Sequence, residues 1–143
     1  MGTVKDVLSH KGSAVHSIEP DATVHDAVVM MVEANVGSLL VINEGAIVGI
    51  LTERDYLRRV ALSDRPQQTI HVSEVMSAPV VTVTSDAEIE DCLAMMTERR
   101  FRHLPVVDDG TLTGVVSIGD LVKARGAEQS TQIKVLHEYI TAR

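Results

Sequence analysis

Apolar residues follow two alternating patterns along the chain. Over residues 24–31 and again over residues 89–96 they stand three or four positions apart, which is the spacing of one face of a helix. We therefore predict an amphipathic helix in each segment, with its buried face formed by Val24, Ala27, Val28 and Met31 in one and by Ile89, Cys92, Leu93 and Met96 in the other.

A different pattern follows each helix. An uninterrupted apolar run is succeeded by a short polar turn with a glycine and then by a second apolar run, which predicts two antiparallel strands joined by a tight turn. A further helix is expected to start near Thr52 and near Ser117. The first strands, the turns and the ends of the second strands lie at 39–42, 43–45 and 50–51 in the first half, and at 104–107, 108–110 and 115–116 in the second.

The two patterns recur because the sequence contains an internal repeat. A shift of about 65 residues aligns Pro20–Leu57 with Ser85–Val122 without a gap, and the lead-in segments Val4–Leu8 and Val72–Met76 match as well. The first copy carries extra residues around Lys11 before the alignment resumes. With short strands near 16–18 and 80–83, each copy is a β-α-β-β-α unit, so the predicted fold class is α+β.

One helix start is marked by a sequence signal of its own. Ser85 is followed three positions later by Glu88, the spacing of a capping box in which the two side chains satisfy free amides at a helix N-terminus.

Composition narrows the function classes. The formal charge of the 143 residues is −7, and this acidic charge disfavours binding to the phosphate backbone of a nucleic acid. Only 2% of the residues are aromatic, which also disfavours binding of single strands through base stacking. No segment has the apolar length of a membrane helix or the form of a signal peptide, so we expect a cytoplasmic protein that does not associate with membranes. Cys92 is alone and the six histidines show no zinc-ligand spacing, so no metal site is expected.

The chemistry-bearing segment is Gly49–Asp55, which returns as Gly114–Asp120. In each, a strand ends at a hydroxyl residue, and an aspartate follows three positions later in the first turn of a helix. The helix start and the hydroxyl can bind a phosphate, and the carboxylate can accept hydrogen bonds from two ribose hydroxyls. The same spacing is also an ordinary helix-capping pattern, and for either copy alone both interpretations stay open.

The ordered set of these segments resembles the cystathionine-beta-synthase (CBS) domain. The resemblance is carried by Phe101–Asp108, Gly110 and Gly114–Leu121, with Gly37–Asp55 as a second, similar copy, and it covers roughly Thr3 to Arg125. It implies two CBS repeats, at 3–62 and 70–126, related by pseudo-twofold symmetry. A C-terminal amphipathic helix is expected over 128–142, where Ile133, Leu136 and Ile140 are spaced at about three and four positions.

The resemblance also implies two ligand sites, each built across the repeats. One site combines Asp120, Ser117, Arg102 and His103 with the first lead-in residues Thr3, Val7 and Leu8. The other site combines Asp55, Thr52, Arg54, Gly37 and Ser38 with the second lead-in residues His71, Val75 and Met76.

The function implied is regulatory and not enzymatic. The expected ligand is AMP, ADP or ATP, with a nicotinamide dinucleotide as a further candidate, and ligand binding would signal energy or redox state in trans to a regulated partner protein. The alternatives are a regulator that binds S-adenosylmethionine and a structural dimerisation module with empty sites. A homodimer is the expected assembly. The chain lacks the glycine-rich phosphate loop, the nucleophile arrangement and the carboxylate cluster that a nucleotide-processing enzyme needs, so no catalytic residue is assigned.

Overall fold

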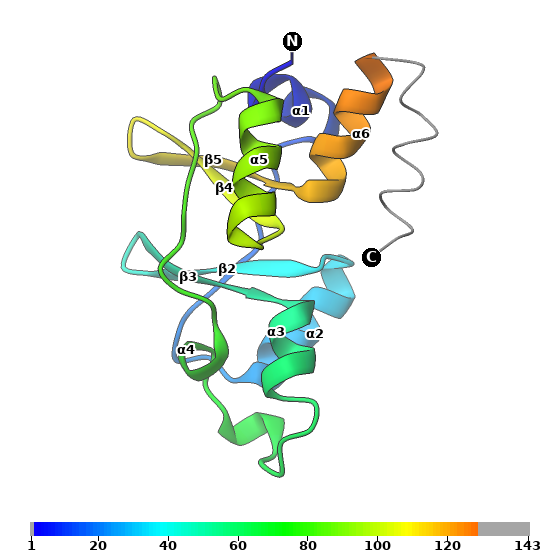
Figure 1. Cartoon of the computed structure of the whole chain (residues 1–143). Helices are drawn as coiled ribbons and strands as arrows, with labels where there is room; N and C mark the ends of the chain where they lie inside the picture. The colour runs from blue at the N-terminus through cyan, green and yellow to red at the C-terminus, as the bar shows by residue number, and fades with distance from the viewer. Residues whose placement is uncertain (1, 129–143) are drawn as a thin grey trace. The chain divides into compact units, whose positions relative to one another are not determined.

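The computed structural model describes residues 2–128, and these form two compact units. Unit 1 combines residues 2–14 with residues 81–128, and unit 2 consists of residues 15–80. Each lead-in segment therefore packs with the hairpin of the other sequence copy. The boundaries of the compact units differ in this way from those of the sequence repeats, although the fold is the expected mixture of helices and small sheets (Figure 1).

Unit 2 is built on a three-stranded sheet in the order β1-β2-β3, with β1 parallel to β2 and β2 antiparallel to β3. Helix α2 contacts β2, helix α3 contacts β3, and the short helix α4 contacts both β3 and α3. The elements of unit 2 are β1 (Ser17–Ile18), α2 (Val24–Ala34), β2 (Ser38–Asn43), β3 (Ala46–Thr52), α3 (Glu53–Arg59), the 3₁₀ helix η1 (Gln67–Thr69) and α4 (Val72–Val75).

Unit 1 repeats the hairpin with fewer strands. Its two strands, β4 and β5, are antiparallel, and helices α1, α5 and α6 gather beside them (Figure 1). The strand expected over 80–83 is reduced to a single parallel bridge between Val83 and Val106. The elements of unit 1 are α1 (Val4–Lys11), α5 (Ile89–Arg99), β4 (His103–Asp108), β5 (Thr111–Ser117) and α6 (Ile118–Glu128).

The hairpin turns explain the shared register of the two copies. Glu44 and Gly45 have φ of 51° and 81°, and Asp109 and Gly110 have φ of 50° and 77°. Two consecutive positive φ values are typical of the type I′ turn, whose twist matches that of the flanking strands. Each hairpin therefore closes in the same way and delivers its second strand to the start of a helix.

The apolar faces predicted from the sequence form the two cores. Ala27, Met31, Cys92 and Met96 are all buried, which confirms that the methionines and the cysteine act as core residues. Burial raises the pKa of the Cys92 thiol, with a smaller contribution from the charge of Asp91, as expected for an inert thiol.

Two local features differ from the sequence-based expectations. The capping box at Ser85 is wrong, because α5 begins only at Ile89 and its N-cap is Glu88. The backbone of Ser85 is engaged elsewhere, since its amide donates to Asp108 and its carbonyl accepts from the amide of Lys5. In addition, the lead-in segments are helices, α1 and α4, which the apolar spacing did not predict.

The helix expected over 128–142 lies outside the described residues, apart from Glu128 at the end of α6. Within residues 2–128, every helix is too short or too polar to traverse a lipid bilayer.

Candidate functional site

The candidate site of unit 1 lies where β5 ends and α6 begins. The amide of Ser117 donates to Oδ2 of Asp120 at 2.8 Å, and the amide of Asp120 donates to the hydroxyl of Ser117 at 3.0 Å. These reciprocal bonds are those of a capping box, which confirms the capping interpretation of this motif. The ligand-binding interpretation stays a prediction. The carbonyl of Arg102 accepts from the amide of Ile118 at 2.8 Å, and His103 pairs with Ser117 across the hairpin. Arg102 and His103 are thereby held beside the same helix start.

A cation also lies at this site. Nζ of Lys11, the last residue of α1, is 2.6 Å from Oδ2 of Asp120 and donates to the carbonyl of Val115 at 2.9 Å. Burial acts to raise the pKa of Asp120, but the hydrogen bonds from Lys11 and Ser117 and the charge of Lys11 outweigh it, so the pKa lies below its usual value. The carboxylate is therefore ionised at neutral pH and able to accept hydrogen bonds.

The first lead-in reaches this site through α1. Thr3 is the N-cap residue of α1, Val7 is buried in the core of unit 1, and Leu8 packs against that core. A Cβ placed on Gly114 would lie 2.8 Å from Cδ2 of Leu8, closer than real Cβ contacts come. Because Gly114 has no side chain, helix α1 can pack closely against the hairpin.

The candidate site of unit 2 has the same capping geometry and a more enclosed carboxylate. Oδ2 of Asp55 accepts from the amide of Thr52 at 3.0 Å and from its hydroxyl at 3.1 Å. Oδ1 of Asp55 accepts from the hydroxyl of Ser77 at 2.9 Å. Asp55 is buried, whereas Asp120 is of intermediate exposure. The two aspartates are equivalent in sequence but not in accessibility.

The remaining residues of the first copy lie near this helix start. The carbonyl of Gly37 accepts from the amide of Glu53 at 3.0 Å, and Ser38 pairs with Thr52. A Cβ on Gly37 would lie 2.5 Å from Oε1 of Glu53, so the Glu53 carboxylate occupies that space. Arg54 is exposed in the first turn of α3.

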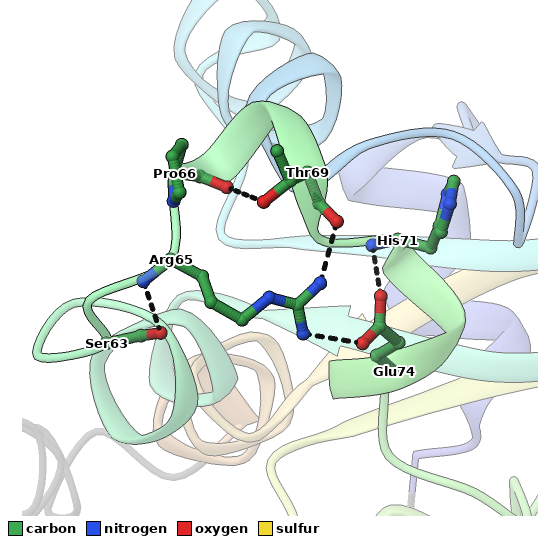
Figure 2. Close-up of polar contacts among 6 residues, drawn as sticks. All are labelled: Ser63, Arg65, Pro66, Thr69, His71 and Glu74. Atoms are coloured by element: carbon green, nitrogen blue, oxygen red, sulfur yellow. Dashed lines mark hydrogen bonds and ion pairs between the residues drawn. The ribbon is translucent and has the colours of Figure 1, made fainter.

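The second lead-in is fixed by a polar cluster that Figure 2 shows. Arg65 donates to Oε1 of Glu74 at 2.8 Å and to the carbonyl of Thr69 at 2.7 Å, and the amide of His71 donates to Oε2 of Glu74 at 2.8 Å. The Arg65 guanidinium, followed by the backbone bond from His71, lowers the pKa of Glu74 to about 2. The cluster holds the short helix α4 in place against the loop that precedes it.

This helix positions the three lead-in residues expected in the second site. His71 is its exposed N-cap residue and approaches the carbonyl of Asp21 through Nδ1 at 2.9 Å. Val75 is buried in the core, and Met76 packs beside Gly49, where a Cβ would lie 2.4 Å from its sulfur. Each set of residues expected to form a site therefore falls within one unit, while the ligand-binding role of both sets stays a prediction.

Two residues at these sites were not predicted from the sequence. Lys11 was noted only as part of the extra residues in the first copy, and Ser77 follows the matched lead-in by one position. No local pattern marks either residue as a partner of an aspartate about 110 or about 20 positions away, because such contacts arise only from packing.

Comparison with known proteins decides the family. The sequence model of the CBS domain matches residues 4–62 and 72–127. The chain belongs to the CBS domain family. The mitochondrial CBS domain-containing protein CBSX3 of Arabidopsis thaliana is 37% identical over 147 aligned positions, covering 96% of this chain and 71% of the relative.

Solved CBS structures share the fold. The crystal structure of the CBS domain NE2398 is 47% identical, covers 87% of this chain and 98% of that chain, and has a TM-score of 0.83. The CBS domain pair of protein MJ0100, crystallised with 5′-methylthioadenosine and S-adenosyl-L-methionine, is 24% identical, with coverages of 90% and 99% and a TM-score of 0.77. Paired CBS domains are regulatory modules that bind small molecules.

Proposed function

We propose that this CBS pair binds an adenine nucleotide, AMP, ADP or ATP, and that binding regulates a partner protein. The observation that carries the proposal is the duplicated arrangement of a hydroxyl residue and an aspartate at a helix start behind a hairpin, with the carboxylate of Asp120 still partly open. An ionised carboxylate at such a position suits two neighbouring ribose hydroxyls, both of which donate.

The surroundings of Asp120 favour a phosphorylated ligand. The ammonium of Lys11 bonds Asp120 at this helix start, the carbonyl of Arg102 accepts from Ile118 there, and His103 pairs with Ser117. Cationic groups beside the N-terminus of an eleven-residue helix stabilise an anion. We assign the ribose to Asp120 and the phosphate to this cationic side, with the N-cap residue Thr3 and the α1 residues Val7 and Leu8 as the proposed lead-in part of the site.

The second site is proposed at Asp55 and Thr52, with Arg54, Gly37 and Ser38 and the lead-in residues His71 and Met76. There a ribose hydroxyl would replace the hydroxyl of Ser77 on Oδ1 of Asp55. The acidic Glu53 beside Gly37 makes this site less favourable for phosphate. A nicotinamide dinucleotide is a further candidate ligand of the pair, and in this site its pyrophosphate would have to avoid Glu53.

S-adenosylmethionine is the alternative ligand, since it shares the adenosine group and is bound by the MJ0100 pair. Its sulfonium is a cation, so Lys11 beside Asp120 disfavours it in unit 1 relative to AMP. A purely structural module is the other alternative, and it would bind none of these compounds.

The experiment is calorimetric titration of the full chain with AMP, ADP, ATP, NAD and S-adenosylmethionine. Asp120→Asn should weaken AMP binding about 10- to 100-fold, the scale of losing charge-assisted hydrogen bonds. Asp109→Asn is the matched control, because it makes the same chemical change at an exposed turn of the same unit, at a φ of 50° that asparagine tolerates. Unchanged AMP affinity in Asp120→Asn would reject the ribose assignment, and no heat with any compound would leave the structural alternative.

The wider role is part of the same proposal. We propose that this protein acts in the cytoplasm as a homodimer, and that nucleotide binding shifts a conformational equilibrium that its protein partner reads. Mass spectrometry of small molecules released from the purified protein identifies the ligand directly.

A further inference from the structure

The carboxylate of Asp120 is bonded by a side chain from outside the repeated motif, and we call such a contact, which covers the carboxylate, a closure. The ammonium of Lys11 bonds Oδ2 of Asp120 at 2.6 Å and the carbonyl of Val115 at 2.9 Å. One cation thus satisfies both the carboxylate and a strand carbonyl at the end of β5.

In unit 2 a different residue makes two comparable bonds, although it reaches Oδ1 of Asp55, whereas Lys11 reaches the capping oxygen, Oδ2, of Asp120. The amide of Ser77 donates to the carbonyl of Ile50, the counterpart of Val115, at 2.8 Å, and the hydroxyl of Ser77 donates to Asp55 at 2.9 Å. The single ammonium of Lys11 therefore stands in for a backbone amide and a hydroxyl.

These two closures differ in how easily they open. Ser77 is fixed by its backbone, because the amide of Ile50 also donates to the Ser77 carbonyl at 3.0 Å, and Arg59 donates to the carbonyls of Val75 and Met76 just before it. The Ser77 hydroxyl can leave Asp55 by side-chain rotation, but the bond from the Ser77 amide to Ile50 opens only if the backbone moves.

Lys11, by contrast, contacts Asp120 and Val115 only through its side chain. It ends α1, the next residue is Gly12, which has open space around it, and the Lys11 side chain is 37% exposed. A four-carbon chain with a compact charge can change rotamer while the backbone stays in place. The closure over Asp120 can therefore open at little cost.

We propose that Lys11 is a mobile counter-ion that makes the Asp120 site selective for phosphorylated nucleosides. The inference rests on the proposed function of that site. In the empty site the ammonium neutralises Asp120. When ribose hydroxyls take over the carboxylate, the ammonium moves to the ligand's phosphate and keeps a charged partner. A nucleoside without phosphate displaces the same ammonium and offers it no partner, so it binds more weakly.

The experiment compares AMP with adenosine by calorimetry on the full chain. In the wild type we expect AMP to bind more tightly than adenosine. Lys11→Met should strengthen adenosine binding and weaken AMP binding, so that the ratio of the two affinities falls at least about tenfold, the scale of one charge-assisted bond. Lys5→Met, which removes an equal charge from an exposed position of the same helix, should leave the ratio unchanged. Lys11→Arg keeps a mobile cation and should retain most of the AMP preference.

The possible failures are distinguishable. If Lys11→Met binds AMP and adenosine with the wild-type ratio, or if both affinities change by the same factor, the counter-ion role is wrong and the nucleotide site stands. If Lys11→Arg loses the preference as Lys11→Met does, the mobile charge is not the cause. If the wild type binds neither compound, the proposed function fails and the role of Lys11 fails with it.

Discussion

The unequal burial of the two aspartates leads to a prediction about stability. Asp55→Ala removes the carboxylate of a buried residue, and that carboxylate accepts three hydrogen bonds, two from Thr52 and one from Ser77. Asp120→Ala removes a carboxylate whose side chain is 26% exposed and whose ionic partner, Lys11, is itself 37% exposed. The sequence motif is the same, but the structure predicts a larger loss for Asp55.

The magnitudes follow from the bonds that each substitution breaks. Losing the capping bonds costs about 1 kcal/mol in either case. Asp55→Ala also removes the Ser77 hydrogen bond to a buried charge, worth about 1.5–3 kcal/mol, for a total of about 2.5–4 kcal/mol. Asp120→Ala instead removes a partly exposed ion pair worth about 0–1 kcal/mol, for a total of about 1–2 kcal/mol.

The assay is urea unfolding followed by circular dichroism. At a slope of about 1–3 kcal/mol per molar urea, Asp55→Ala should lower the midpoint by at least about 1 M, and Asp120→Ala by clearly less. Ser77→Ala is the companion variant, since the double variant with Asp55→Ala should cost less than the sum of the two single changes. Equal midpoints for the two aspartate variants, or full additivity of the Ser77 and Asp55 changes, would refute the reasoning from burial.

Two further predictions concern unit 2. Gly49→Ala should lower the free energy of unfolding by about 1–3 kcal/mol, because the new Cβ would lie 2.4 Å from the sulfur of Met76 and 3.1 Å from the carbonyl oxygen of Ser77. A change below about 0.5 kcal/mol, measured by urea unfolding, would contradict that packing. The Arg65–Glu74 pair lowers the pKa of Glu74 to about 2, so its stabilising effect is present above the unfolded-state pKa of about 4.5 and is lost as the pH falls toward 2. Glu74→Gln should therefore flatten the dependence of stability on pH between those values, and an unchanged pH profile would show that the pair does not contribute.

The sequence predicted local elements well where one physical signal dominated. Residues 24–31 and 89–96 form helices because their apolar faces have helical spacing, and both hairpins form because the turn residues adopt positive φ. The capping-box pattern at Ser85 gave a wrong helix start, because the backbone of Ser85 is hydrogen-bonded to Lys5 and Asp108. A capping pattern predicts a helix start only when tertiary partners leave those groups free.

In the candidate sites, too, some features were predicted from the sequence and others were found only in the structure. The hydroxyl and aspartate pairs were visible in the sequence, and the combination of each lead-in with the opposite copy followed from the family resemblance. Neither signal could reveal that Ser77 closes Asp55 or that Lys11 closes Asp120. These contacts join residues that are distant along the chain, so no periodicity or spacing records them.

By itself the sequence determined the duplication, which is written in the order of residues along the whole chain. It also determined the helices over 24–31 and 89–96, the hairpins and the capped helix starts at Thr52 and Ser117, because these depend on residues close together in the sequence. Only the tertiary structure decided that the two equivalent aspartates differ. Burial and the choice of hydrogen-bond donor depend on what the folded chain brings alongside each carboxylate, and there unit 2 supplies a backbone-held serine where unit 1 supplies a lysine held by its side chain alone.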